Sequence, residues 1–175
     1  MTAFSLLATL GIAACSTSDG GSTTPPTQAT SQAETSTIEN PRDLKAVADA
    51  CTLLTPDQLA ALGGGGQPEA STSAYQEPQC YWRNDAFGVD VAINTVAGGL
   101  DVAFKEPGTE RTEIASFPAA KSGETTTLCH IAVVVAEDQQ LEIDYTRFGG
   151  DTPEMLDTCG MAEKLAAEAV KNLPA

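Results

Sequence analysis

Four stretches of the chain alternate apolar and polar residues with a period of two, which is typical of β-strands that bury one face. Residues 80–82 and 87–93 are separated by Asn84-Asp85-Ala86, and residues 129–135 and 141–145 are separated by a polar turn. Each pair can therefore form an antiparallel hairpin. A further short strand is expected around Ile114 to Phe117, and residues 99–104 fit either a helical turn or a loop. The sequence predicts an antiparallel sheet of about four to five strands.

Two helices are expected to pack on this sheet. The first begins at Thr55, a suitable N-cap that precedes Pro56 and forms a capping box with Gln58, and Gly63 ends it. The second is an amphipathic C-terminal helix whose apolar positions recur three and four residues apart: Met155, Cys159, Ala162, Ala166, Ala169 and Leu173. The predicted fold class is thus α+β, with a short N-terminal helix and a long C-terminal one.

The charge of the chain argues against a nucleic-acid partner. The formal net charge is -15, and among the 24 acidic residues only Asp19, Glu34 and Glu39 precede Pro41. No basic stripe offsets this acidity locally, so the folded part should repel phosphate backbones. We interpret the acidity as a means of keeping the domain soluble.

The first fifteen residues look like an export signal. Their apolar run is too short to span a bilayer, and it ends in Ile12-Ala13-Ala14-Cys15, which resembles the bacterial lipobox. The resemblance implies that residues 1–14 are a lipoprotein signal peptide and that Cys15 carries a diacylglyceryl group, with two acyl chains sufficing for stable anchoring. An ordinary secretory signal with an incidental cysteine is the alternative. Because no charged residue precedes Cys15, the true start codon could lie upstream of Met1.

A tether is expected between the anchor and the folded domain. Residues 15–40 are rich in Ser, Thr, Gly and Pro and contain almost no apolar side chains after Cys15. Such a composition cannot offset the entropy of ordering the chain. As a flexible coil it would hold a single domain, residues 41–175, roughly 25 to 30 Å from the membrane.

Four cysteines remain in the domain once Cys15 is set aside: Cys51, Cys80, Cys129 and Cys159. In an exported domain an even number indicates disulfides, and three connectivities are open. We prefer Cys51 with Cys80 and Cys129 with Cys159, because each pair would join the start of a helix to a core-facing strand position. A zinc site is disfavoured, since the chain has no CxxC pair and only one histidine, and no cofactor is expected.

The order of these motifs resembles a known family. Cys51-Thr52-Leu53-Leu54-Thr55-Pro56, Cys80-Tyr81-Trp82, Phe117-Pro118-Ala119, Cys129 and Cys159 are similar to the actinobacterial cell-envelope lipoproteins built on a domain of unknown function. The resemblance covers nearly all of residues 41–175. It implies an envelope location, on the outer face of the cell membrane and facing the cell wall, and it implies no reaction. A looser analogy to PsbP-like α+β sandwiches concerns the fold alone.

Few residues suggest catalysis. His130 follows Cys129 in a strand, so the two side chains point to opposite faces and cannot form a dyad. Asp90, Glu142 and Asp144 lie on outward strand faces and could converge if their strands are neighbours, giving a cation site or acid/base chemistry. A solvated face is the simpler interpretation, which we favour.

Aromatic residues suggest a binding surface. Trp82, Tyr75, Tyr81 and Phe104 could line an apolar groove, although Trp82 is expected in the core and Tyr81 on the opposite side, as the candidate partner contact. We therefore expect a non-catalytic binding or accessory module for an envelope protein, lipid or glycan. An envelope hydrolase using acidic residues is the alternative, which a deep pocket with two buried carboxylates of perturbed pKa would favour.

Overall fold

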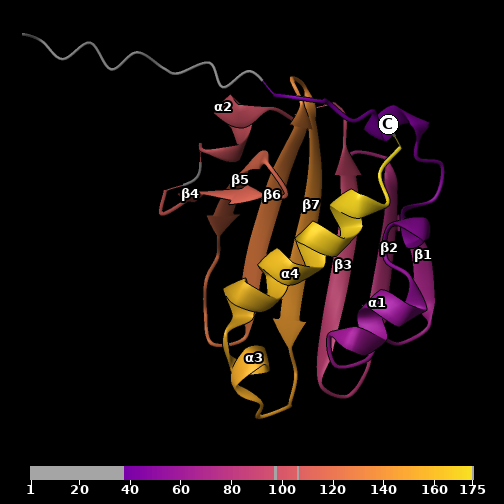
Figure 1. Cartoon of the computed structure of the whole chain (residues 1–175), viewed down its shortest axis with the longest axis vertical. Coiled ribbons are helices and arrows are strands. Elements are labelled where there is room, and N and C mark those ends of the chain that lie inside the picture. Colours follow the sequence, from indigo (N-terminus) through magenta and orange to yellow (C-terminus); the bar gives the residue numbers. More distant parts are fainter. Residues whose placement is uncertain (1–37, 97, 106, 175) are drawn as a thin grey trace, which may run out of the picture. The chain divides into compact units, whose positions relative to one another are not determined.

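A single antiparallel sheet of seven strands forms the centre of the domain (Figure 1). The computed structural model describes residues 38–96, 98–105 and 107–174. The strand order is β1-β2-β3-β7-β6-β5-β4, and the strands are β1 (Pro68–Thr72), β2 (Pro78–Arg83), β3 (Phe87–Asn94), β4 (Glu110–Ile114), β5 (Phe117–Ser122), β6 (Leu128–Ala136) and β7 (Gln139–Arg147). The α+β class is confirmed, and so are the β2–β3 and β6–β7 hairpins. The predicted number of strands was too low.

The additional strands come from two places where alternation is absent. All five residues of β1 are exposed, so this edge strand buries no apolar face that a periodic pattern could show. The strand expected around Ile114 to Phe117 is instead a tight turn between β4 and β5, because Ala115 and Ser116 have positive φ values of 49° and 73°. Two residues in this conformation match the twist of a hairpin.

The predicted N-terminal helix is present with the expected ends, whereas the predicted C-terminal helix is divided in two. The helical segments are η1 (Leu44–Ala46), η2 (Ala50–Leu53), α1 (Pro56–Ala61), α2 (Leu100–Ala103), α3 (Pro153–Leu156) and α4 (Thr158–Lys171). The predicted C-terminal helix is in fact α3 and α4, because Asp157 leaves the helical conformation and caps α4 through a 2.8 Å bond from Gly160 N to its carboxylate. Residues 99–104 form a helical turn, α2.

The core lies between one face of the sheet and the helices. Helix α4 crosses β6 and β7, and η2 packs on β2 and β3 (Figure 1). The strand residues facing this layer are the alternating apolar ones, including Trp82, Val91, Ile131 and Ile143, all nearly or fully buried. Packing already begins at Ile38, which lies against the core. On the opposite face the described residues place only the short helix α2, which contacts β5 and β6, and we call this face the open face.

Two disulfides join the helical layer to the sheet. Cys51 in η2 is bonded to Cys80 in β2, and Cys129 in β6 is bonded to Cys159 in α4. These are the two pairs preferred from the sequence, and each sulfur bridge lies on the helix side of the sheet. Cys15, residues 1–14 and the tether up to Thr37 lie outside the described residues.

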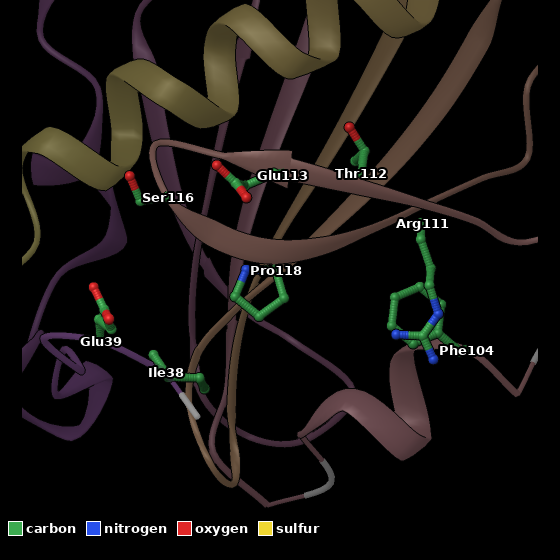
Figure 2. Close-up of a pocket in the computed structure, with 8 residues that line it drawn as sticks. All are labelled: Ile38, Glu39, Phe104, Arg111, Thr112, Glu113, Ser116 and Pro118. Atoms are coloured by element: carbon green, nitrogen blue, oxygen red, sulfur yellow. The ribbon is translucent and has the colours of Figure 1, made fainter. Parts of the chain in front are cut away.

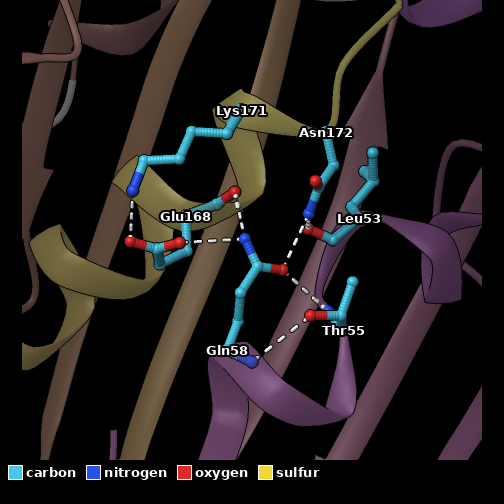
Figure 3. A network of polar contacts seen from close by, with 6 residues as sticks. All are labelled: Leu53, Thr55, Gln58, Glu168, Lys171 and Asn172. Atoms are coloured by element: carbon cyan, nitrogen blue, oxygen red, sulfur yellow. Dashed lines mark hydrogen bonds and ion pairs between the residues drawn. The ribbon is translucent and has the colours of Figure 1, made fainter. Parts of the chain in front are cut away.

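Helix α1 is fixed to the end of α4 by one glutamine side chain (Figure 3). Thr55 and Gln58 form the predicted capping box. The same Gln58 amide donates to the Glu168 carboxylate at 2.9 Å and accepts from Asn172 Nδ2 at 2.8 Å. Asn172 also donates to the carbonyl oxygen of Leu53 at 2.9 Å. This network links the end of α4 to η2 and α1, which lie more than 100 residues earlier in the sequence.

Gln58→Ala should therefore lower the free energy of unfolding by about 1 to 2 kcal/mol, because the variant loses half of a capping box and leaves Asn172 with one partner fewer. Urea unfolding measures this value. Gln67→Ala, at an exposed position, is the matched control and should change stability by less than about 0.5 kcal/mol. Equal effects of the two substitutions would show that the network does not stabilise the domain.

One core hydroxyl has no partner. Tyr145 is fully buried beside Phe87, and its Oη makes no hydrogen bond within the described residues. Burying a hydroxyl without a hydrogen bond costs about 1 to 3 kcal/mol. Tyr145→Phe should thus raise the free energy of unfolding by about 1 kcal/mol, whereas Tyr81→Phe on the open face should leave it unchanged. A loss of stability in Tyr145→Phe, measured by urea unfolding, would contradict this account.

Candidate functional site

A row of polar side chains crosses the open face. Asp90 in β3 is the direct partner of Asp144 in β7, so the convergence of outward carboxylates that the sequence allowed does occur. Asp144 in turn is paired with His130 in β6. With the neighbouring strands the row reads Ser122, His130, Asp144, Asp90, Tyr81 and Glu69. Side chains directly opposite each other on one face lie about 4.5 to 5.5 Å apart at Cβ, so adjacent members can interact.

Hydrogen bonds hold the carboxylates of Asp90 and Asp144 and that of Glu142, which lies two residues before Asp144 on β7. The amide of Gln79 donates to both oxygens of Asp90 at 2.7 Å. His130 Nδ1 lies 2.9 Å from Asp144 Oδ1, and Asn94 Nδ2 donates to Glu142 Oε1 at 2.8 Å. Within the described residues no Lys or Arg forms an ion pair with any of the three. The open face is therefore a fixed, predominantly anionic surface.

These contacts shift two pKa values. Partial burial raises the pKa of Asp90; the Gln79 hydrogen bond opposes that rise, and the charges of Asp144 and Glu142 add to it. Burial by itself lowers the pKa of His130, but the hydrogen bond and the charge of Asp144, together with the charge of Glu142, outweigh burial and raise it above 6.5. His130 is thus held more strongly as imidazolium in the folded domain than in the unfolded chain.

Stability should consequently fall as the pH rises through the pKa of folded His130. A raised pKa means that its stabilising contribution is complete below about pH 6.5 and is lost above the folded value. The thermal midpoint should decrease between pH 6 and pH 8.5, and His130→Gln should remove that decrease, since His130 is the chain's one histidine. If the thermal midpoint of the native chain changes with pH no more than that of His130→Gln, the His130–Asp144 coupling is excluded.

Other residues singled out from the sequence are not assembled into a site. Cys129 is in a disulfide and points to the core, so it forms no dyad with His130. Across the described ranges no group of His, Cys, Asp and Glu side chains could hold a metal ion. The same ranges contain no helix long and apolar enough to cross a membrane.

The suggested aromatic groove does not form. Trp82 is buried in the core, whereas Tyr81 lies on the open face with its ring over Gly88, where a Cβ would lie 2.5 Å from the hydroxyl. Tyr75 is exposed in the β1–β2 connection, and Phe104 belongs to the other end of the sheet. Tyr81 keeps its place as the candidate partner contact because it continues the polar row.

A cavity of about 470 Å³ lies beside the β4–β5 hairpin (Figure 2). Its volume falls within the range of small-molecule pockets, but it is open to solvent, since Glu39, Arg111, Glu113 and Ser116 are exposed. The guanidinium of Arg111 stacks over the ring of Phe104 at 4.0 Å from its centroid. The walls come from three separate segments of the chain: Ile38, Glu39, Phe104, Arg111, Thr112, Glu113, Ser116 and Pro118.

The sequence does not predict this cavity, because no local residue pattern indicates it. Of its residues, the sequence suggests only Phe104 as part of a binding surface, and that surface is a different groove. The cavity depends on the β4–β5 hairpin, which the alternation did not predict, and on Ile38 and Glu39, which precede the predicted domain boundary. The Arg111–Phe104 contact joins the end of α2 to β4 across a loop, so no periodic pattern within one element predicts it.

The fold and its surfaces define a class of protein: a disulfide-braced α+β domain with one polar sheet face and one small cavity. The chain belongs to the family described as "Protein of unknown function (DUF3558)", whose model matches residues 10–172. The expected domain of unknown function is thereby confirmed. No curated protein and no solved structure matches the chain.

Proposed function

We propose that the chain is an exported lipoprotein of an actinobacterial cell envelope, anchored through Cys15 to the outer face of the cell membrane. The single observation that carries the export is the pair of disulfides in the domain, because such bonds persist outside the reducing cytosol. The Ile12-Ala13-Ala14-Cys15 motif supports the lipid anchor. Residues 1–14 would then be the signal peptide and residues 15–40 the tether.

The domain itself, residues 41–175, would act as a non-catalytic binding or accessory module. Its polar groups on the open face are held by neighbours rather than gathered around an enclosed reaction site. A cavity of ligand size and a surface with Tyr81, Asp90 and Asp144 suit recognition of an envelope protein, lipid or glycan. Recognition needs no nucleophile, and none of the polar contacts requires a cofactor.

Metabolic labelling tests the anchor. Cells that express the full chain should incorporate labelled palmitate into it, and Cys15→Ala should abolish the label and release the protein from the membrane fraction. Ser18→Ala, close to the same site, is the matched control and should be labelled normally. Labelled Cys15→Ala protein, or an unlabelled parent that remains membrane-bound, would refute the anchor.

An envelope hydrolase that uses acidic residues is the second candidate. The observation favouring it is the direct pairing of Asp90 with Asp144, because two carboxyl groups in unequal environments can divide acid and base roles. If it holds, the chain should cleave purified cell-wall fragments, and Asp90→Asn and Asp144→Asn should each abolish cleavage. Asp85→Asn, in the exposed β2–β3 turn, should have no effect. Intact fragments between pH 4 and 9 would reject this candidate.

A further inference from the structure

The cavity beside β4 carries charges of both signs. Arg111 and Glu113 are two residues apart on β4 and so project to the same side of the strand, with their Cα atoms about 7 Å apart. Glu39 adds a second carboxylate from the N-terminal segment. Ile38 and Pro118 lie between the Arg111–Phe104 pair and Glu39 (Figure 2). The Arg111–Phe104 pair thus lies at one side of the cavity and Glu39 at the other, with Ile38, Pro118 and its cross-strand neighbour Glu113 between them.

These charges do not neutralise one another. Over the described residues, Arg111, Glu39 and Glu113 take part in no ion pair. The stacking of the Arg111 guanidinium on Phe104 accounts for this, since the ring keeps the cation at its own end of the cavity. The donors of Arg111 and the two carboxylates are therefore available to a ligand.

We propose that this cavity binds a short zwitterionic peptide. The peptide carboxylate would accept hydrogen bonds from Arg111, its ammonium group would donate to Glu113 or Glu39, and its small side chains would lie against Ile38 and Pro118. This assignment names the ligand class of the binding module proposed above and rests on that proposal.

Charge complementarity selects this ligand over other anions. A phosphate dianion would meet Arg111 but would be repelled by Glu39 and Glu113. A fatty acid would satisfy Arg111 and leave both carboxylates without a partner. A peptide with two free ends engages both charged ends of the cavity at once, and losing either end should weaken binding by about tenfold or more.

Ligand-observed NMR titrations on the full-length chain test the proposal with three probes: dialanine, N-acetyl-dialanine and dialanine amide. Dialanine should bind at millimolar concentration, and each blocked form should bind about tenfold more weakly. The proposal would be overturned if all three probes bind equally. It would also be overturned if dialanine shows no binding at concentrations up to about 20 mM.

Two variants then identify the charged ends. Arg111→Gln should weaken the binding of dialanine and should bind dialanine and its amide equally. It should still bind dialanine more tightly than the N-acetyl form. The double variant Glu39→Gln/Glu113→Gln should show the reverse pattern. Arg83→Gln is the matched control, because Arg83 also stacks on a phenylalanine, Phe148 at 4.4 Å, away from the cavity. Unchanged preferences in both variants, or the same loss in Arg83→Gln, would refute the site.

The outcome is independent of the anchor. Palmitate labelling at Cys15 decides whether the chain is a lipoprotein, whereas the titrations decide only which ligand the cavity takes. Because Arg111 and Glu113 are exposed, their substitution should leave the thermal midpoint unchanged, and that measurement confirms that each variant is folded.

Discussion

The double variant Cys129→Ala/Cys159→Ala should lose roughly 3 to 4 kcal/mol of unfolding free energy, the value expected in the chain-entropy model for a loop of about thirty residues. The native bond closes a separation of 30 residues and joins β6 to α4. Both cysteines are buried, so small cavities add to the loss. Since the total free energy of unfolding of such a domain is about 5 to 15 kcal/mol, the loss should be measurable by urea unfolding and in the thermal midpoint.

The other disulfide provides the comparison. Cys51→Ala/Cys80→Ala opens a loop of nearly equal length, a separation of 29 residues, and should cost a similar amount. If either pair can be removed for less than about 1 kcal/mol, the unfolded chain is not constrained as the model requires.

Leu165→Ala should lower the free energy of unfolding by about 2 to 5 kcal/mol. Leu165 is fully buried on the face of α4 that packs on β6 and β7, and a truncated side chain there leaves a cavity that the sheet cannot close. Equilibrium urea unfolding gives the difference directly.

Leu156→Ala is the matched control for the same chemical change. Leu156 lies in α3 and is 52% exposed, so its truncation removes little buried surface and should cost less than about 1 kcal/mol. A cost at Leu165 no greater than that at Leu156 would mean that α4 does not stabilise the sheet through this residue.

Alternation predicted the central strands well because they bury one face completely. Val89, Val91, Ile131 and Ile143 face the helices, and the residues between them face outward. The cap of α1 was equally visible, since Thr55, Pro56 and Gln58 act locally. Local chemistry and one-sided burial are the signals that a single sequence carries most clearly.

The missing elements had no such signal. Strand β1 is held only by its pairing with β2, so its exposed residues carry no pattern. Ile114 and Phe117 are both buried, and their apolar side chains suggested one strand across this segment. They in fact flank a two-residue turn. Asp157 was placed inside a helix because its neighbours keep the apolar period, although its side chain caps a new helix.

The open face was predicted conditionally. The outward direction of Asp90 and Asp144 followed from alternation, but their pairing depended on β3 and β7 being neighbours, which is a property of the whole topology. The contribution of His130 to this row, and of Gln79 and Asn94 to the carboxylates, likewise required the register of the strands.

The Cys51–Cys80 bond also determines how the domain would respond to mechanical load. A force applied at the N-terminal end can peel away residues 38–50, but it then reaches Cys51 and passes through sulfur into β2, inside the sheet. Further extension would have to slide β2 against β3 and break many of their hydrogen bonds together. The loop of residues 52–79, which the bond bypasses, is therefore shielded from stepwise unravelling.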